Sequence, residues 1–463
     1  MRRIVRTGIL SGILLVFITC VANAQEAAVP LTLEESIAIA LRQSVVIQSA
    51  REGVTASEAR KKEAFTGFLP KLSTTYNYTR NDPAPYIKQP SPSPITNLTI
   101  GTQDNYIWSL DARQPLFTGG RLEANYEISR LGLNASKQEE MGTVQDIVLE
   151  VKRSYYTILK AKRLVGVAKQ SVEQFIAQKD LAKNFYEVGL VPRNDYLQAE
   201  VRLADGTQSL VRTENRLEES HARFNTILRR PVSTPVDVVD ILDYKPYEKE
   251  FDECLQTAMD NRPEIQVFAL KAEQAGKKVK VVESEFYPSV NLVGSYQRYG
   301  DSADLNGSAY RNPENWSVAA VATWDLWEWG RTKYSRDASV SQEKQAVNAL
   351  TNVKDQVALD VKNAWLAVKE AEKLIAVTRT SIEQAEENYR INQERYREQV
   401  SRMTDVLDAL TLLTFARASW SNALSDYHIA LAALERAMGV SWKPEDSGQV
   451  TGDSKEVSEC LSV

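Results

Sequence analysis

Two acidic residues, Asp405 and Asp408, stand three positions apart in a stretch that is predicted to be helical. Side chains with this spacing lie on one face of a helix, so the two carboxylates would concentrate negative charge there. Such a pair can attract cations. It can also be an ordinary solvated surface, or the acidic first turn that suits a helix dipole. From these residues alone the three interpretations stay open.

Other residues capable of chemistry give little support for catalysis. The two histidines, His221 and His428, stand alone on helical stretches, where packing or solvent contact is the usual role. The sequence has no Gly-rich phosphate loop, no paired-Cys metal spacing and no nucleophile elbow. Its many carboxylates lie on long amphipathic helices, where they form the wet face. We therefore expect no enzyme activity, no metal site and no cofactor.

The N-terminus has the features of a secretion signal. Arg2, Arg3 and Arg6 precede an apolar run from 9 to 21, and Ala22-Asn23-Ala24 gives the small-x-small pattern of a signal-peptidase site. We expect 1–24 to be a signal peptide and the mature chain to lie outside the cytoplasm. Cys20 could carry a lipid, but the residues before it lack the small side chain that lipoprotein processing needs.

The overall charge excludes one class of partner. Lys and Arg number 56 against 61 Asp and Glu, and the signal holds three of the basic residues and no acid. An acidic chain without a basic run is not expected to bind nucleic acid. After the signal, no apolar run approaches the ~20 residues of a membrane helix. Any membrane span would therefore be made of strands.

The chain contains one long unit twice. Residues 33–78 align with 251–296 without a gap, at a shift of 218 positions, and Gly120-Arg121 aligns with Gly330-Arg331 at a shift of 210. A period of this length is a duplication and not a solenoid of short repeats. We expect a first repeat at 25–248, a second at 249–442, and a flexible tail at 443–463.

Each copy predicts a β-hairpin, over 72–117 and 290–327. Apolar and polar residues alternate there, as in a strand with one greasy face. In the first copy a proline-rich loop without regular structure would join the strands. A soluble sandwich would explain the alternation, but aromatic residues near strand ends favour a membrane barrel; these are Trp108, Trp316 and Trp324.

Helical periodicity fills the rest of each copy. A single helix is predicted over 34–65, with Thr32 and Glu35 as a capping box. Heptad spacing then predicts long helices that pack lengthwise, each followed by a shorter return helix: 121–186 and 194–228 in the first copy, 331–396 and 404–438 in the second. A long helix spans roughly 100 Å, so two short helices would stack end to end beside it. Residues 231–247 would form a small side domain at mid-height.

Closure requires more than one chain. Strands in hydrocarbon must satisfy every backbone group, so only a closed barrel is allowed. Four strands are too few to close a barrel. Three chains would supply twelve strands, and their helices would continue the barrel as a ring of helices that lie side by side.

At this point the chain resembles the TolC family of outer-membrane efflux and secretion channels, over nearly its whole mature length. Four short runs carry the resemblance: Pro115-Leu116-Phe117-Thr118-Gly119-Gly120-Arg121, its degenerate second copy ending in Gly330-Arg331, Val188-Gly189-Leu190-Val191, and Asp405-Val406-Leu407-Asp408. Pro115, Gly119, Gly120 and Gly330 mark the strand-to-helix turns.

The resemblance implies an α+β fold, with four strands per chain in a trimeric 12-stranded β-barrel within outer-membrane lipid. A long α-helical barrel with a small equatorial domain would cross the periplasm below it. The homotrimer would be a passive exit duct of a tripartite efflux or type I secretion system. An inner-membrane pump and a periplasmic adaptor, also called a membrane fusion protein, would hand over the substrate. The cargo is not indicated.

The resemblance also assigns roles to particular residues. Val188, Gly189 and Leu190 match a helical tip that docks the adaptor, whereas the second tip, Glu398-Gln399-Val400, departs from that pattern. Asp405 and Asp408 match the selectivity constriction of the pore. Arg402 lies near the position of a gate arginine but is displaced from it.

A second class of protein has to be weighed against a channel. A non-channel periplasmic coiled-coil adaptor or envelope spacer would also contain long helical hairpins. Such proteins do not carry duplicated strand pairs with aromatic ends, so this interpretation ranks second. An enzyme ranks last, because no catalytic constellation can be assembled.

Overall fold

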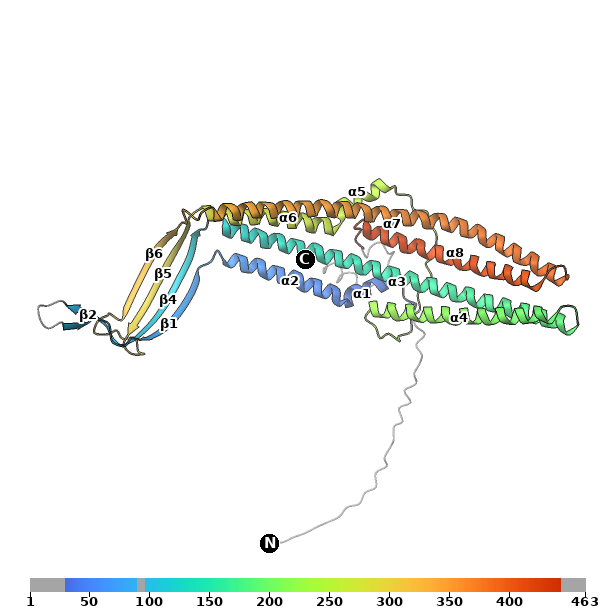
Figure 1. The fold of residues 1–463 in the computed structure, drawn as a ribbon, viewed down its shortest axis with the longest axis horizontal. Helices are drawn as coiled ribbons and strands as arrows, with labels where there is room; N and C mark the ends of the chain where they lie inside the picture. The colour runs from blue at the N-terminus through green and yellow to red at the C-terminus, as the bar shows by residue number, and fades with distance from the viewer. Residues whose placement is uncertain (1–29, 90–95, 443–463) are drawn as a thin grey trace, which may run out of the picture.

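The molecule is long, with a β-sheet at one end and helices over the remainder (Figure 1). The computed structural model describes residues 30–89 and 96–442. The predicted signal peptide 1–24, with Cys20, and the predicted tail 443–463 lie outside the described residues.

Two helical hairpins of equal length form most of the molecule. Helices α3 (Arg121–Glu187) and α7 (Arg331–Arg397) have 67 residues each, and α4 (Arg193–Ile227) and α8 (Met403–Ala437) have 35 each. All these bounds are related by the shift of 210 residues and lie within one residue of those expected from periodicity. None of the described helices combines the length and apolarity needed to cross a membrane.

The helix predicted over 34–65 is in fact two helices, α1 (Leu33–Gln43) and α2 (Val45–Thr66). The break lies at Ser44, whose extended backbone ends α1 and whose Oγ accepts the Ile47 N–H at 3.4 Å. A serine in this position caps the next helix, and the continuous helical pattern over 34–65 hid it. The second repeat breaks likewise, between α5 (Phe251–Asn261) and α6 (Pro263–Glu283), with proline at the first helical position.

Four antiparallel strands form the sheet in the order β1-β4-β5-β6. Their bounds are β1 (Lys71–Arg80), β4 (Asp104–Phe117), β5 (Ser289–Gly300) and β6 (Glu314–Thr323). The expected second hairpin is therefore shorter than 290–327, since residues beyond Thr323 leave the strand.

The proline-rich loop between β1 and β4 was wrongly expected to lack regular structure. It contains a small antiparallel ribbon of β2 (Tyr86–Gln89) and β3 (Thr96–Thr99). This ribbon lies beyond the four-stranded sheet at the end of the molecule (Figure 1).

The two faces of the four-stranded sheet differ in chemistry. The register places Tyr76 opposite Trp108 and Tyr296 opposite Trp316, on the aromatic face. The other face carries hydrogen-bonded polar groups, with Asp111 accepting from Ser109 at 3.0 Å and from Ser295 at 2.7 Å. The sheet therefore has one apolar, aromatic face and one polar face.

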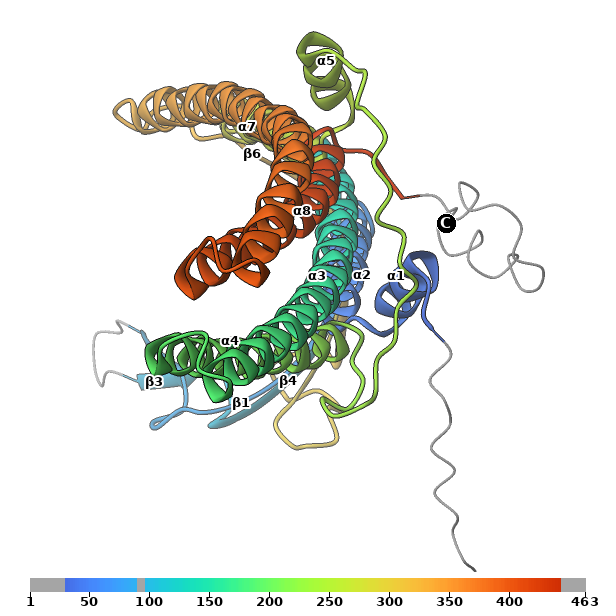
Figure 2. The same cartoon turned by 90° about the vertical axis from the view of Figure 1, so that its right-hand side faces the viewer.

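Helices α7, α8, α3 and α4 lie side by side in a curved layer (Figure 2). Helices α1 and α5 and the extended segment between α4 and α5 lie on its convex side (Figure 2). The main hydrophobic core lies where α1, α5 and this segment pack against the layer, around Tyr155, Phe224 and Tyr427. The Tyr155 hydroxyl donates to the backbone oxygens of Leu31 and Val239, at 3.0 and 2.8 Å. These bonds hold the chain before α1 and the segment between α4 and α5 against α3.

Candidate functional site at the helical tips

The two hairpin turns at the far end of the helices share one backbone geometry. Gly189 has φ 77° and Gln399 has φ 63°, both left-handed. In the first turn Leu190 donates its N–H to the Phe185 oxygen at 2.8 Å, and in the second Val400 donates to the Arg395 oxygen at 2.8 Å. This is the Schellman ending of a helix. The second turn keeps the fold of the first although it lacks the glycine.

Apolar side chains at the first turn face solvent. Val188 and Leu190 are 68% and 51% exposed. Behind both turns, a separate apolar cluster joins the hairpins and includes Phe175, Tyr396 and Leu410. Tyr396 is 1% exposed and stacks on Phe185, with ring centroids 5.7 Å apart. Burial raises the pKa of Tyr396 to about 12. The cluster packs side chains of both hairpins against one another behind the two turns.

Asp405 caps the helix that carries it. Its Oδ2 accepts the backbone N–H of Arg402 at 3.1 Å, at the start of α8. A carboxylate in the first turn also suits the positive end of the helix dipole. The Arg402 guanidinium makes no ion pair with any of the described residues. Asp405 thus has a local structural role whether or not it also faces a pore.

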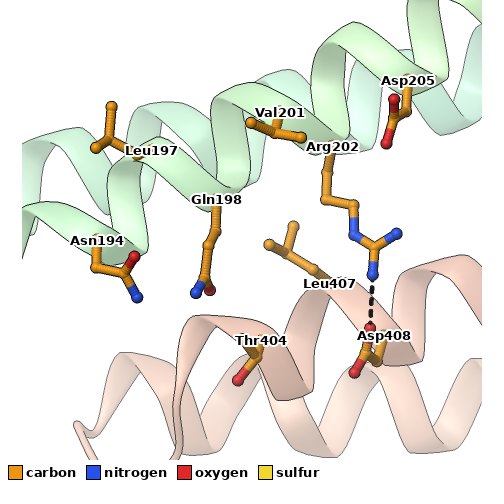
Figure 3. A pocket seen from close by; sticks show the side chains of 9 residues that line it. All are labelled: Asn194, Leu197, Gln198, Val201, Arg202, Asp205, Thr404, Leu407 and Asp408. Carbon is orange, nitrogen blue, oxygen red and sulfur yellow. Dashed lines mark hydrogen bonds and ion pairs between the residues drawn. The ribbon is translucent and has the colours of Figure 1, made fainter.

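Asp408 reaches across to the other hairpin. Its Oδ1 accepts from the Arg202 guanidinium at 3.0 Å, which joins α8 to α4 (Figure 3). Both side chains remain well exposed, at 67% for Asp408 and 42% for Arg202. Asp408 is therefore a partly compensated charge, unlike Asp405.

The Arg202–Asp408 pair crosses a cleft of about 360 Å³ between α4 and α8. Polar and apolar side chains from both helices line it (Figure 3): Asn194, Leu197, Gln198, Val201, Arg202, Asp205, Thr404, Leu407 and Asp408. Sequence reasoning missed Arg202. A signal was available, because the position of Asp408 in the second repeat corresponds to Gln198 in the first, one helical turn from Arg202.

The strand-to-helix turns at the opposite end of the helices depend on left-handed backbone. Gly120 and Gly330 have φ 87° and 86° and precede α3 and α7. Gly119 has φ 65°, and a Cβ there would lie 2.6 Å from the Ser284 oxygen. In the second copy Trp329 takes the equivalent position, with φ 53°. Pro115 marks a shift in the β4–β5 register.

His428 packs against α3. His428 stacks on Tyr156 with ring centroids 5.0 Å apart, and its Nε2 lies 2.9 Å from the Asp243 oxygen. Burial lowers the pKa of both His428 and His221. Among the described residues no group of three or more His, Cys, Asp or Glu side chains is arranged to hold a metal ion.

A family model described as "outer membrane efflux protein" matches residues 37–228 and 254–440, most of the chain. The chain belongs to the outer membrane efflux protein family. One matched segment falls within each of the two expected repeats. This protein is therefore a channel component of the outer membrane, and none of the matches supports a non-channel adaptor or spacer.

Individual relatives agree with the family over nearly the full length. The outer membrane efflux protein BepC of Brucella suis biovar 1 is 22% identical over 423 residues, which cover 89% of this chain and 86% of that protein. Among solved structures, the outer-membrane channel OprN has a TM-score of 0.76 at 18% identity, with 89% and 90% of the two chains covered. The CmeC outer membrane channel of Campylobacter jejuni has a TM-score of 0.75 at 17% identity, with 92% and 88% covered. The fold is that of such channels.

Proposed function

We propose that three copies of this efflux protein close into one duct, which receives substrates from an inner-membrane pump through a periplasmic adaptor. The observation that carries this proposal is the open sheet. Strands β1 and β6 are its edges, and each has one unpaired side. An open edge in hydrocarbon leaves backbone groups unsatisfied, so the edges must pair with other copies.

The internal pairing supplies the register for that closure. Strand β4 pairs with β5, with Leu110 opposite Tyr296 and Ala112 opposite Gly294. Shifting both strands by one repeat puts Ala320 of β6 opposite Tyr78 of β1 in the next copy. A small residue would face a large one, as cross-strand packing favours. The aromatic face would contact outer-membrane lipid, since Trp316 and Leu72 are 74% and 69% exposed.

The tips would form the narrow mouth of the duct. In a trimer, Asp405 and Asp408 would each form a ring of three carboxylates at the ends of α8. Rings of carboxylates attract cations and repel anions. Two features support the assignment: both side chains are exposed, and both lie in the first two turns of α8.

Planar-bilayer recordings test this mouth. The double variant Asp405→Asn/Asp408→Asn should lower cation selectivity and relieve block by divalent cations, with the trimer retained. Asp252→Asn, an exposed acid of α5 on the convex side, is the matched control and should leave both unchanged. Unaltered selectivity in the double variant would disprove the constriction.

The adaptor would dock at the first tip. The exposed Val188 and Leu190 beside the Gly189 turn support a contact with an apolar partner. Val188→Asp should abolish dye efflux from intact cells while leaving single-channel conductance intact. Val400→Asp is the matched change at the second tip, and its effect reports whether that tip docks the adaptor as well.

A further inference from the structure

Toward the helical tips, the long helix of the first repeat meets the return helix of the second, where α8 packs against α3. At this junction Lys160 Nζ lies 2.9 Å from Asp426 Oδ1. The Lys160 side chain is 28% exposed and that of Asp426 is 53% exposed. This ion pair thus joins the first repeat to the second inside one copy.

Because the repeats match at a shift of 210 residues, the junction has a counterpart between α7 and α4. Within one copy these two helices lie at opposite ends of the curved layer and cannot meet (Figure 2). The counterpart must therefore form between copies, a step that rests on the proposed trimer. The contacts of the internal junction then indicate which residues meet at the seam between subunits.

The shift turns Lys160 into Glu370 on α7, and Asp426 into Arg216 on α4. The two charges are exchanged, yet they remain opposite. Glu370 and Arg216 are both exposed. Neither has an ion-pair partner in the part of the chain that the structure describes, whereas Lys160 and Asp426 do. Two solvent-exposed charges are thus left at the positions where a seam contact is needed.

We propose that Glu370 of one copy forms an ion pair with Arg216 of the partner subunit, at each of the three seams. The exchange of charges also disfavours wrong pairings between the junction inside a copy and the seam between copies. If α7 met α8 of the partner subunit, Glu370 would face Asp426, and if α3 met α4 of the partner subunit, Lys160 would face Arg216. Both pairings set like charges opposite each other, which is how interfaces exclude wrong partners.

A second contact on the same seam follows the same rule. Inside one copy, Gln145 Nε2 donates to the Gly439 oxygen at 3.0 Å. The shift places Asp355 of α7 near Arg229 of the partner subunit. The backbone is equivalent, because Gly439 has φ 71° and Arg229 has φ 57°. Because the acceptor inside the chain is a backbone oxygen, the donor offered to the Asp355 carboxylate at the proposed seam would be the Arg229 side chain.

Charge reversal in full-length protein, purified in detergent, tests the Glu370–Arg216 pair. Glu370→Arg and Arg216→Glu should each lower the fraction of trimer that survives mild heating by about two-fold or more, since like charges then meet at three seams. The double reversal Glu370→Arg/Arg216→Glu should restore the wild-type fraction. Lack of rescue, with both single variants folded by circular dichroism, would overturn the pairing.

Crosslinking gives an independent readout. The Cα atoms of two long, ion-paired side chains lie too far apart for a disulfide, so a short bismaleimide is used as the crosslinker. The background carries Cys460→Ser, and Cys254 is buried. Glu370→Cys/Arg216→Cys should yield trimer-sized species on denaturing gels. Lys160→Cys/Asp426→Cys, the internal counterpart, should crosslink within one chain and stay at monomer size. If the wild-type protein were not trimeric in native mass spectrometry, the proposed function itself would be refuted. If it were trimeric but gave no crosslink between positions 370 and 216, only the Glu370–Arg216 pairing would be refuted.

Discussion

The two hairpin tips have the same backbone and different side chains. Both turns use a left-handed residue and the same pair of helix-ending hydrogen bonds. The first presents Val188, Gly189 and Leu190, and the second presents Glu398, Gln399 and Val400. The duplicated fold therefore fixes where each tip lies, while the side chains at the two tips differ. Function has to be sought in the unmatched side chains.

The strand-to-helix turns at the other end show the reverse situation. There, Gly119 is confined by its surroundings, because a Cβ would lie 2.6 Å from the Ser284 oxygen, whereas Trp329 occupies the equivalent place and is 86% exposed. One copy is constrained by packing within the chain and the other is not. The two ends therefore differ in what limits divergence.

Substitutions at Gly119 and Trp329 test whether the two strand-to-helix turns are constrained differently. Gly119→Ala adds a side chain at positive φ against a backbone oxygen, and should destabilise the folded protein by about 2–4 kcal/mol. Trp329→Ala keeps the same backbone and removes only an exposed side chain. Its effect should stay within about 0.5 kcal/mol. Thermal unfolding in detergent measures both, and equal losses would show that the two turns are constrained alike.

A smaller effect tests the equivalence of the tips. Gly189→Ala meets no atom within 4 Å, so it isolates the cost of left-handed backbone, about 1 kcal/mol. Gln399→Gly relieves that cost and should stabilise the second tip by up to about 1 kcal/mol. Both are read from chemical denaturation of the helical region. If both variants were destabilising, the shared geometry would be wrong as an explanation of the second turn.

Much of this fold can be predicted because its signals are long and repeated. A period held over 67 residues fixes a helix, and a second copy repeats it at constant spacing. Signals carried by one residue were harder to detect. The break at Ser44 depends on a single N-cap inside a continuous helical pattern, and the β2–β3 ribbon lies among prolines that argue against strands.

The site was only partly predictable for a related reason. Asp405 and Asp408 are close in sequence, so their shared helix was evident. The Arg202–Asp408 contact joins residues 206 positions apart and depends on how α4 leans toward α8. Sequence periodicity assigns each helix a face but does not specify which residues of two helices meet. Long-range pairs become visible only through the repeat, as with Asp408 and Gln198.

The charge of Asp408 depends on its partner Arg202. Arg202→Gln removes the partner of Asp408 and leaves its carboxylate uncompensated. Because the pair is exposed, its loss should cost less than about 1 kcal/mol of stability. Cation selectivity in planar bilayers should nevertheless rise, since negative charge at the proposed mouth increases. Arg193→Gln, an exposed arginine at the start of α4 without an ion-pair partner among the described residues, is the control. Unchanged selectivity with Arg202→Gln would place Asp408 away from the pore.

His428 has no histidine counterpart in the first repeat. Burial holds the pKa of His428 below its ordinary value, while the equivalent position on α4 is the exposed Glu218. Asp243 and Asp240 favour the charged ring and Arg163 opposes it, but burial dominates. An unfolded chain therefore takes up a proton near pH 6.5 that the folded chain refuses, so stability should fall as pH drops from 7 through 6. His428→Gln should flatten this slope without removing it, because burial lowers the pKa of His221 as well. Thermal unfolding between pH 7.5 and 5.5 measures the slope, and an unchanged slope in His428→Gln would mean that the ring is protonated equally in both states.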